Sequence, residues 1–496
     1  MDDEELRTEN ERLRARVGEL EVENVELRAL ITRLENRVAE FEAQLKKNSN
    51  NSSKPPSSDD DRARAERAEE AKEHSATKSS GKKKRKPGKQ RGAKGHHLAR
   101  VNPDHVVNHS PASCAGCGAD LAAAPVTGTE TRQVLDFPER TYEATDHIAE
   151  RRQCACGAET KADFPPEAMA PVCWGPRVAA FTLYLLVCQH LPHKRTAELL
   201  REFLGTHVST GWVANQTLRY AGRLRSFIET LKNCLAGAWS AHVDETGTRV
   251  KGARRWVHVM CTETLTYLFV HDKRGKEALD HAGILDRFRG TLIHDRWHTY
   301  WKYTAIKHGL CGAHLLRDLR AVGEWWVQSE WTTSMAELLT SANRVCDKVR
   351  SEQRSSLSTR RLNRLSADYD AIVAKALDAN PDPGRKRTKV EKDAYNLACA
   401  FRDRKGEILL FCRDLSIDFT NNQAERDLRM LKVALKITGG HRNAKVAQGH
   451  LDIRSYVETG RKHGENRFSL IERLVRGNPW MVPDGVTKAE VAQAAT

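Results

Sequence analysis

A seven-residue repeat runs through residues 1–47 and limits how this chain begins its fold. A 3.5-residue period keeps one seam facing a partner helix, so the repeat predicts a parallel two-stranded coiled coil that dimerises the protein. The alternative is a single surface helix that packs on its own domain. The d positions of the repeat are Leu6, Leu13, Leu20, Leu27, Leu34 and Phe41, and the a positions are Asn10, Val17, Asn24, Ile31, Val38 and Leu45.

Residues 48–100 show no hydrophobic period and predict a disordered linker that carries a basic arm. Residues 46–58 are polar and interrupted by Pro55 and Pro56, which is typical of a linker. Residues 81–95 hold eight basic residues and no acid, so we expect this arm to stay unfolded until it meets phosphate. A solvated tail is the alternative. The basic residues are Lys82, Lys83, Lys84, Arg85, Lys86, Lys89, Arg91 and Lys94.

The composition excludes wholesale disorder and favours a polyanionic partner. Of 496 residues, 39% are hydrophobic and 30% are charged, and the formal net charge is +15. The longest apolar stretch, Val178–Cys188, is shorter than the roughly 20 residues of a membrane span and predicts a buried helix. The first five residues are acidic and do not resemble a secretory signal. We therefore expect a soluble intracellular protein with no membrane contact.

Four of the 12 cysteines form two clusters, each followed by glycine. Cys114 and Cys117 are spaced as in a zinc knuckle, whereas Cys154 and Cys156 have one intervening residue instead of two. Four thiolates satisfy a tetrahedral Zn²⁺ ion, so residues 101–165 predict a zinc ribbon that binds DNA. The 36 residues between the clusters suit a pair of β-hairpins. Incidental thiols or a redox pair are the alternatives.

Residues 166–237 predict a helical region. An apolar-periodic segment ends at Gly205, and Ser209 then provides the N-cap of a second segment. This pattern fits a helix-turn-helix and fits a plain helical hairpin equally well.

The hydrophobic period changes after residue 238. The segments 241–250, 255–262 and 265–270 are rich in β-branched and aromatic residues and predict an antiparallel meander. A helix over 276–285 and a short strand over 291–294 follow. The order βββαβα describes a mixed sheet flanked by helices.

Two acids in this region suggest a metal site. Asp244 lies within the first strand and Asp295 directly follows the fourth, so the two lie close together if these strands are neighbours. Paired carboxylates repel unless a cation lies between them, which favours Mg²⁺ or Mn²⁺. Glu425, at the start of a helical stretch, is the third candidate, and three oxygen donors fit two metal ions for phosphoryl transfer. Turn, cap and surface roles are the alternative.

The 129 residues between Asp295 and Glu425 are too many for a simple loop. Residues 320–405 show helical periodicity and a basic patch at 385–389, which predicts an all-helical insertion that either clamps DNA or presents a solvated face. On the helix after Glu425, Arg426 and Lys432 are candidate phosphate contacts. His314 either approaches the acids or is structural.

The chain resembles a transposase of the insertion sequence 66 family, which uses a DDE catalytic triad. The resemblance rests on the zipper, the 47–59 linker, the basic stretch, the paired cysteines and three motifs. These motifs are Asp244-Glu245-Thr246, Cys311-Gly312-Ala313-His314 and Asn421-Asn422-Gln423-Ala424-Glu425-Arg426. It implies that Asp244, Asp295 and Glu425 bind metal ions on a ribonuclease H-like fold, for DNA cleavage and strand transfer of a bacterial mobile element.

Together these inferences predict a multidomain α+β protein. Its parts are a coiled coil (1–47), a linker with a basic arm (48–100), a zinc ribbon (101–165), a helical region (166–237), a ribonuclease H-like core (238–319 and 406–480), a helical insertion (320–405) and a tail (481–496). Expected partners are transposon ends, target DNA, a second copy of the chain or a higher oligomer, and accessory proteins of the element. The expected location is the bacterial cytoplasm, on the nucleoid. The rival functions are a non-catalytic DNA-binding regulator and a structure-specific nuclease on the same fold.

Overall fold

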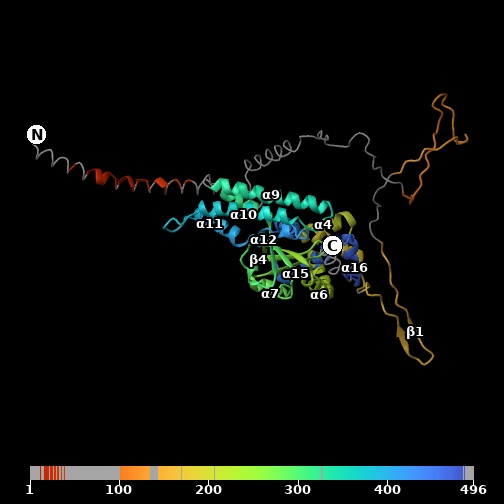
Figure 1. Ribbon diagram of the computed structural model, residues 1–496. Coiled ribbons are helices and arrows are strands. Elements are labelled where there is room, and N and C mark those ends of the chain that lie inside the picture. Colours follow the sequence, from red (N-terminus) through yellow and green to blue (C-terminus); the bar gives the residue numbers. More distant parts are fainter. Residues whose placement is uncertain are drawn as a thin grey trace, which may run out of the picture. The chain divides into compact units, whose positions relative to one another are not determined.

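The computed structural model describes residues 101–133, 143–168, 170–205, 207–324, 328–483 and 485, together with 12, 16–21, 23–25, 27, 28, 31, 32, 35 and 38. The chain divides into two compact units (Figure 1). One is residues 64–146, and the other combines residues 1–63 with 147–496.

A five-stranded mixed sheet organises the larger unit. Its strands are β3 (Ser240–Val250), β4 (Ala253–Cys261), β5 (Thr266–His271), β6 (Thr291–His294) and β7 (Lys307–Leu310), in the order β5-β4-β3-β6-β7. The first three are antiparallel, whereas β6 runs parallel to β3 and β7 parallel to β6. Lys251 and Gly252 both have positive φ, 51° and 77°, as a two-residue hairpin turn requires. The meander and the strand at 291–294 are as predicted from sequence; β7 was not predicted.

Each face of the sheet packs on its own helices, because successive side chains of a strand point to opposite faces. On one face, Val243 and Met260 belong to a core shared with Leu183, Phe227 and Tyr456. On the other face, β3 and β4 pack against α14 (Asn422–Thr438). That second core contains Val257, Val259, Leu268, Ala424, Leu428 and Leu431.

Helix α15 (Ala444–Lys462) covers the edge strand β5, and its side chains satisfy the backbone of that edge. The N–H groups of alternate β5 residues donate to it: Thr266 to Thr459 Oγ1 at 3.1 Å, Leu268 to Ser455 Oγ at 2.9 Å, and Val270 to Gln448 Oε1 at 3.1 Å. An open strand edge is a pairing and aggregation hazard. Here a helix closes it with polar side chains.

Helices precede and follow the sheet in the sequence. Before it come α3 (Pro176–Val187), α4 (His193–Leu204), α5 (Thr210–Ala221), the 3-10 helix η2 (Gly222–Leu224) and α6 (Arg225–Ala236). α7 (Lys276–Ala282) and the 3-10 helix η3 (Tyr300–Lys302) connect strands, and α16 (Arg467–Arg476) packs on α3. The predicted buried helix at 178–188 is α3. No helix in the described part of the chain combines the length and hydropathy that a bilayer crossing requires.

The predicted second helix of the 166–237 region is α5. Gly205 ends α4 in the left-handed conformation, with φ of 64°, and the Ser209 side chain accepts a hydrogen bond from the Trp212 N–H at 3.1 Å. Helix α15 packs along α5. A DNA-binding role for this helix pair stays a prediction.

The long segment between β7 and α14 is helical, as the sequence predicted. It contains α8 (Gly312–Gly323), α9 (Ser329–Ser351), α10 (Thr359–Asp378), α11 (Lys389–Asp403), α12 (Lys405–Ile408) and α13 (Leu410–Arg413). Helices α9, α10 and α11 lie side by side (Figure 1). Met335, Tyr369 and Phe401 of these helices belong to one core, which extends to α8 and to Leu310 of β7.

The described residues among 12–38 are helical and exposed, and they include the seam residues Val17, Leu20, Leu27, Ile31 and Val38. Because no partner helix covers them among the described residues, the coiled coil stays a prediction.

The second cysteine cluster lies in the turn of a hairpin formed by β1 (Arg151–Gln153) and β2 (Glu159–Lys161). Of the described residues between the clusters, 151–153 form strand β1 of this hairpin, Asp120 makes an isolated bridge to Ser113, and the others form no strand. Residues 134–142 lie outside the described residues, so a second hairpin between the clusters stays a prediction. The turns surround the cysteines themselves.

Candidate active site

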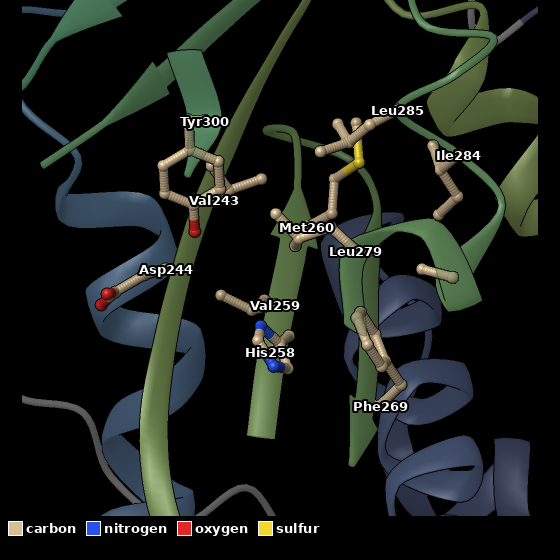
Figure 2. A pocket seen from close by; sticks show the side chains of 11 residues that line it. Val243, Asp244, His258, Val259, Met260, Phe269, Leu279, Ile284, Leu285 and Tyr300 are labelled. Carbon is tan, nitrogen blue, oxygen red and sulfur yellow. The ribbon is translucent and has the colours of Figure 1, made fainter. Parts of the chain in front are cut away.

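Asp244 lies near the middle of β3, on the face that α14 covers. It pairs across the sheet with Val259, which packs against α14. Asp244 lines a small pocket, and Figure 2 shows its carboxylate pointing away from the apolar side chains that also line it. That pocket has room for about 10 Å³, enough for one water molecule at most, so it is not a substrate cavity.

Asp295 directly follows β6, the parallel neighbour of β3. The last paired residues of these strands are His242 and Ile293, so Asp244 and Asp295 each lie two residues further along adjacent strands. The Asp295 Oδ1 atom accepts a hydrogen bond from the Trp297 N–H at 3.1 Å. Arg296 between them has a φ of 55° and pairs with Asp318. The chain therefore turns sharply away from the sheet just after the acid.

The two aspartates lie in an environment that disfavours their charged forms. Burial, with smaller contributions from the charges of Glu245 and Asp295, raises the pKa of Asp244 to about 7. Burial and the charge of Glu245 raise the pKa of Asp295 to about 6. Buried carboxylates that repel each other are stabilised by a divalent cation, so this pair fits a metal ion.

Glu425 lies in the first turn of α14, the helix that packs on β3 and β4. Its Oε1 atom is 3.8 Å from Nε2 of His314, in the first turn of α8. Burial lowers the pKa of His314 to about 4, so this imidazole is neutral near pH 7. His314, which the sequence left between a site role and a structural role, thus contacts the third acid.

Asn421, which precedes α14, ties the helix to its surroundings. Its backbone N–H donates to Cys311 Sγ at 3.0 Å, and its Oδ1 atom lies 3.0 Å from Nδ1 of His242. Burial raises the pKa of Cys311 to about 11, so it stays a thiol. The sequence marked Asn421 only as part of a motif.

No sequence pattern indicated a role of its own for Glu245, which follows Asp244 and points to the other face of β3. Its side chain is 1% exposed. It accepts hydrogen bonds from the Tyr300 hydroxyl at 2.8 Å and from Arg274 Nε at 2.7 Å. Tyr300 belongs to the segment that follows Asp295, so Glu245 fixes that segment against β3.

The predicted phosphate contacts divide into two groups. Arg426 and Lys432 lie on α14, and the positive charge of Lys432 acts on Asp244 in the direction that lowers its pKa. The basic arm lies outside the described residues; its members are Lys82, Lys83, Lys84, Arg85, Lys86, Lys89, Arg91 and Lys94.

The two cysteine pairs form similar turns. The Gly118 N–H donates to the Cys114 carbonyl and the Gly157 N–H to the Cys154 carbonyl, at 2.9 and 2.8 Å. Both glycines have positive φ, 76° and 87°. In each pair, hydrogen bonds from the backbone and the thiol of the second cysteine lower the pKa of the first. A lowered pKa favours the thiolate form, which is the form that binds zinc.

Within the described residues, no three or more His, Cys, Asp and Glu side chains are gathered closely enough to hold a metal ion as they stand. The structure brings Asp244 and Asp295 onto neighbouring strands and α14 over their face. A shared metal ion at the three acids therefore requires their side chains to draw closer.

Comparison with known proteins identifies the class of this chain. The profile described as the transposase IS66 family matches residues 171–449, more than half of the chain. The chain therefore belongs to the IS66 transposase family, as the sequence motifs predicted. The profile of the zinc-finger binding domain of transposase IS66 matches residues 111–157, which include both cysteine pairs, and supports a structural zinc ion. Residues 1–99 match a family of unknown function. No curated protein matches the chain.

Proposed function

We propose that this chain is a DDE transposase that cleaves the ends of an insertion sequence and joins them to target DNA through Asp244, Asp295 and Glu425. One observation carries the proposal. Two partly buried aspartates occupy equivalent positions beyond the paired ends of parallel neighbouring strands, and each has a raised pKa. Helix α14 covers their face of the sheet and carries the glutamate in its first turn.

The topology supports a ribonuclease H-like assignment for residues 238–319 and 406–480. Three antiparallel strands are followed by two parallel ones, in the order β5-β4-β3-β6-β7. Asp244 lies on the central strand β3 and Asp295 directly follows its neighbour β6. Glu425 lies on the helix that returns to the sheet after the long helical segment. Residues 320–405 would then be an insertion into the core.

Oxygen donors of this kind suit Mg²⁺ or Mn²⁺, which would lower the pKa of an attacking water and stabilise the leaving oxygen. Asp244, Asp295 and Glu425 would hold the metal. In the first step, water attacks the phosphodiester at the element end and releases a 3′-hydroxyl. In the second, that hydroxyl attacks a target phosphodiester in line and displaces another 3′-oxygen. No bond between protein and DNA is needed.

The remaining parts would hold and pair the DNA. The 1–47 zipper would join two copies or build a higher oligomer, and the basic arm, the zinc ribbon on Cys114, Cys117, Cys154 and Cys156, and the helices of 166–237 would bind transposon ends. Arg426 and Lys432 would contact phosphate near the acids. This role places the protein on the bacterial nucleoid in the cytoplasm, where accessory proteins of the element are further candidate partners.

Cleavage and joining of labelled duplexes that carry the sequences flanking the gene test the proposal. We expect Mg²⁺-dependent products from the unaltered chain and a loss of roughly 10²–10³-fold or more in Asp244→Asn, Asp295→Asn and Glu425→Gln. These changes keep side-chain shape and remove charge. Asp368→Asn, an exposed substitution on α10, is the matched control and should retain full activity.

Each rival function predicts a different result. A non-catalytic regulator would bind the duplexes and leave them intact in Mg²⁺ and Mn²⁺. A structure-specific nuclease would give cut strands without joined products. Equal cleavage by the three acid variants and the unaltered chain would overturn the site assignment.

A further inference from the structure

A polar cleft of about 450 Å³ opens beside the first turns of α14. Its lining residues do not include Asp244, Asp295 or Glu425. Its walls come from α14, α15, α16 and the turn between β4 and β5. Five cationic side chains line it against three carboxylates, an excess of two positive charges. Arg426, which directly follows Glu425, lies at its edge.

A single carboxylate, Glu458, serves three of the arginines. Its oxygens lie 3.0 Å from Arg454 Nη2, 2.7 Å from Arg461 Nε and 3.5 Å from Arg467 Nη2. Within the described residues, Arg426 makes one hydrogen bond, to the Asn422 carbonyl, and no ion pair. Guanidinium groups therefore outnumber their counter-charges here.

The other ion pair of the cleft is already balanced. Lys462 Nζ lies 2.9 Å from Asp427 Oδ2, and both side chains are 4% exposed. Lys462 also donates to the carbonyls of Thr262 and Leu265. The excess charge thus belongs to the arginines, whose planar donor groups match the oxygens of phosphate.

Arg454 shows an unmet donor in the cleft wall. It is 5% exposed, its Nη1 donates to the Val187 carbonyl at 3.0 Å, and its Nη2 pairs with Glu458. Its Nε is buried and has no hydrogen-bond partner among the described residues. A buried donor left unpaired costs roughly 1–3 kcal/mol, so an anion that reaches it gains that interaction.

We propose that this cleft binds backbone phosphates of the DNA strand that is cut. These phosphates are close in sequence to the phosphodiester that lies at the three acids. The placement relative to the cut rests on the proposed function, because Arg426 and Glu425 are consecutive on α14. A DNA strand carries a phosphate at every nucleotide, so a strand held at the acids brings further phosphates past this face of the helix. Arg461 and Arg467 supply the exposed contacts, and Arg454 the buried one.

Binding of labelled duplex to the full chain in EDTA, across a range of salt concentrations, tests this without any chemistry. We expect the double variant Arg461→Gln/Arg467→Gln to raise Kd about 10-fold and to reduce the slope of log Kd against log salt by about 2. The matched control is Arg473→Gln/Arg476→Gln, which removes two exposed charges from α16 outside the cleft. The control should bind like the unaltered chain. Because Arg461 and Arg467 both pair with Glu458, whose side chain is 7% exposed, binding is compared at a temperature at which circular dichroism shows all three proteins to be folded.

Any of three results would overturn the proposal. The first is that the cleft variant binds DNA with unchanged affinity and salt slope, and the second is that both double variants lose affinity equally. The third is that inorganic phosphate stabilises the unaltered chain but not the cleft variant while DNA binding is unchanged, which would mean that the cleft binds a free oxyanion only. Failure of the proposed function is separate, because Asp244→Asn should bind DNA normally whether or not the acids are catalytic.

Discussion

The side-chain amide of Asn421 donates a hydrogen bond to the carbonyl oxygen of Val243 at 2.7 Å. The pairing of β3 with β6 ends at His242, so this amide takes up the next carbonyl of β3. Asn421 itself is fully buried. The residue before Asp244 on the sheet is thereby tied to the residue before the helix that carries Glu425, which sets the distance between the two acids.

Replacing Asn421 by alanine should weaken both stability and cleavage. The Val243 carbonyl and His242 lose a buried partner, which costs about 1–3 kcal/mol of unfolding free energy. The hydrogen bond that positions α14 on β3 is also lost, and we expect a roughly 10–100-fold lower cleavage rate in a folded variant. Chemical denaturation and the end-cleavage assay measure the two effects. Asn363→Ala, exposed on α10, is the control, and full activity in folded Asn421→Ala would contradict this role.

The ion pair between the buried Glu245 and the partly exposed Arg274 should be strongly coupled. The Glu245 side chain is 1% exposed and that of Arg274 is 39% exposed, so removal of Arg274 leaves a buried carboxylate without this counter-charge. We expect Glu245→Gln to cost about 1–3 kcal/mol, and a double-mutant cycle with Arg274→Gln to give a coupling of about 1 kcal/mol or more. The exposed pair Lys375 and Glu330 is the comparison cycle and should couple by about 0.5 kcal/mol or less. Equal coupling in both cycles would argue against a special role for Glu245.

Zinc binding should require all four clustered cysteines, and removal of the zinc should leave the sheet folded. We expect about one zinc ion per purified chain, measured by elemental analysis, and its loss in serine variants of Cys114, Cys117, Cys154 and Cys156. Cys173→Ser, an exposed cysteine outside both turns, is the control and should retain zinc. Because these cysteines lie outside the hydrophobic cores, chelation should not abolish the cooperative unfolding of the sheet. Full zinc content in a double variant of either pair would refute the assignment.

Local sequence pattern predicted the strands that carry the two aspartates, because their β-branched and aromatic residues and tight turns encode a meander. It did not predict β7, whose four residues Lys307–Leu310 include a glycine and show too little alternation. The helices between β7 and α14 follow from their apolar period. The closing of the β5 edge by α15 depends on polar residues far apart in the sequence and has no local signal.

The candidate site shows the same division. Asp244 and Asp295 stand out because acids within or directly after strands are unusual, and Glu425 is the acid at the start of a helical stretch; the family resemblance then implied that the three act together. Glu245 appeared only as the neighbour of Asp244 in the Asp244-Glu245-Thr246 motif. Its role depends on Arg274 and Tyr300, which are brought to it only by the packed fold.

Ser455 should matter for stability because it satisfies the edge strand. It is fully buried, accepts the Leu268 N–H at 2.9 Å and donates to the Leu451 carbonyl at 2.8 Å. Ser455→Ala leaves a buried N–H unpaired, and we expect a loss of about 1–3 kcal/mol in urea denaturation. The control is Ser334→Ala on α9, an exposed serine that also bonds the carbonyl four residues earlier, with an expected change within about 0.5 kcal/mol. Equal losses in the two variants would mean that the edge contact contributes nothing of its own.

Asp452 on α15 should make the fold less stable at high pH. Burial raises its pKa from 3.8 to about 6, so the folded state holds this proton more tightly than the unfolded state does. The resulting stabilisation is present below about pH 4 and is lost as the pH rises toward 6, above which a charged carboxylate must be kept buried. Asp452→Asn retains an acceptor for Gln448 Nε2, which lies 2.8 Å from Asp452 Oδ1, and removes the charge.

We therefore expect Asp452→Asn to raise the unfolding free energy by about 1–3 kcal/mol at pH 8 and to change it little at pH 4. Thermal or urea denaturation at the two pH values, in EDTA, measures the difference. Asp368→Asn removes an exposed carboxylate and should show no such pH-dependent gain. A gain for Asp452→Asn of the same size at both pH values would mean that packing, and not the buried charge, governs the effect.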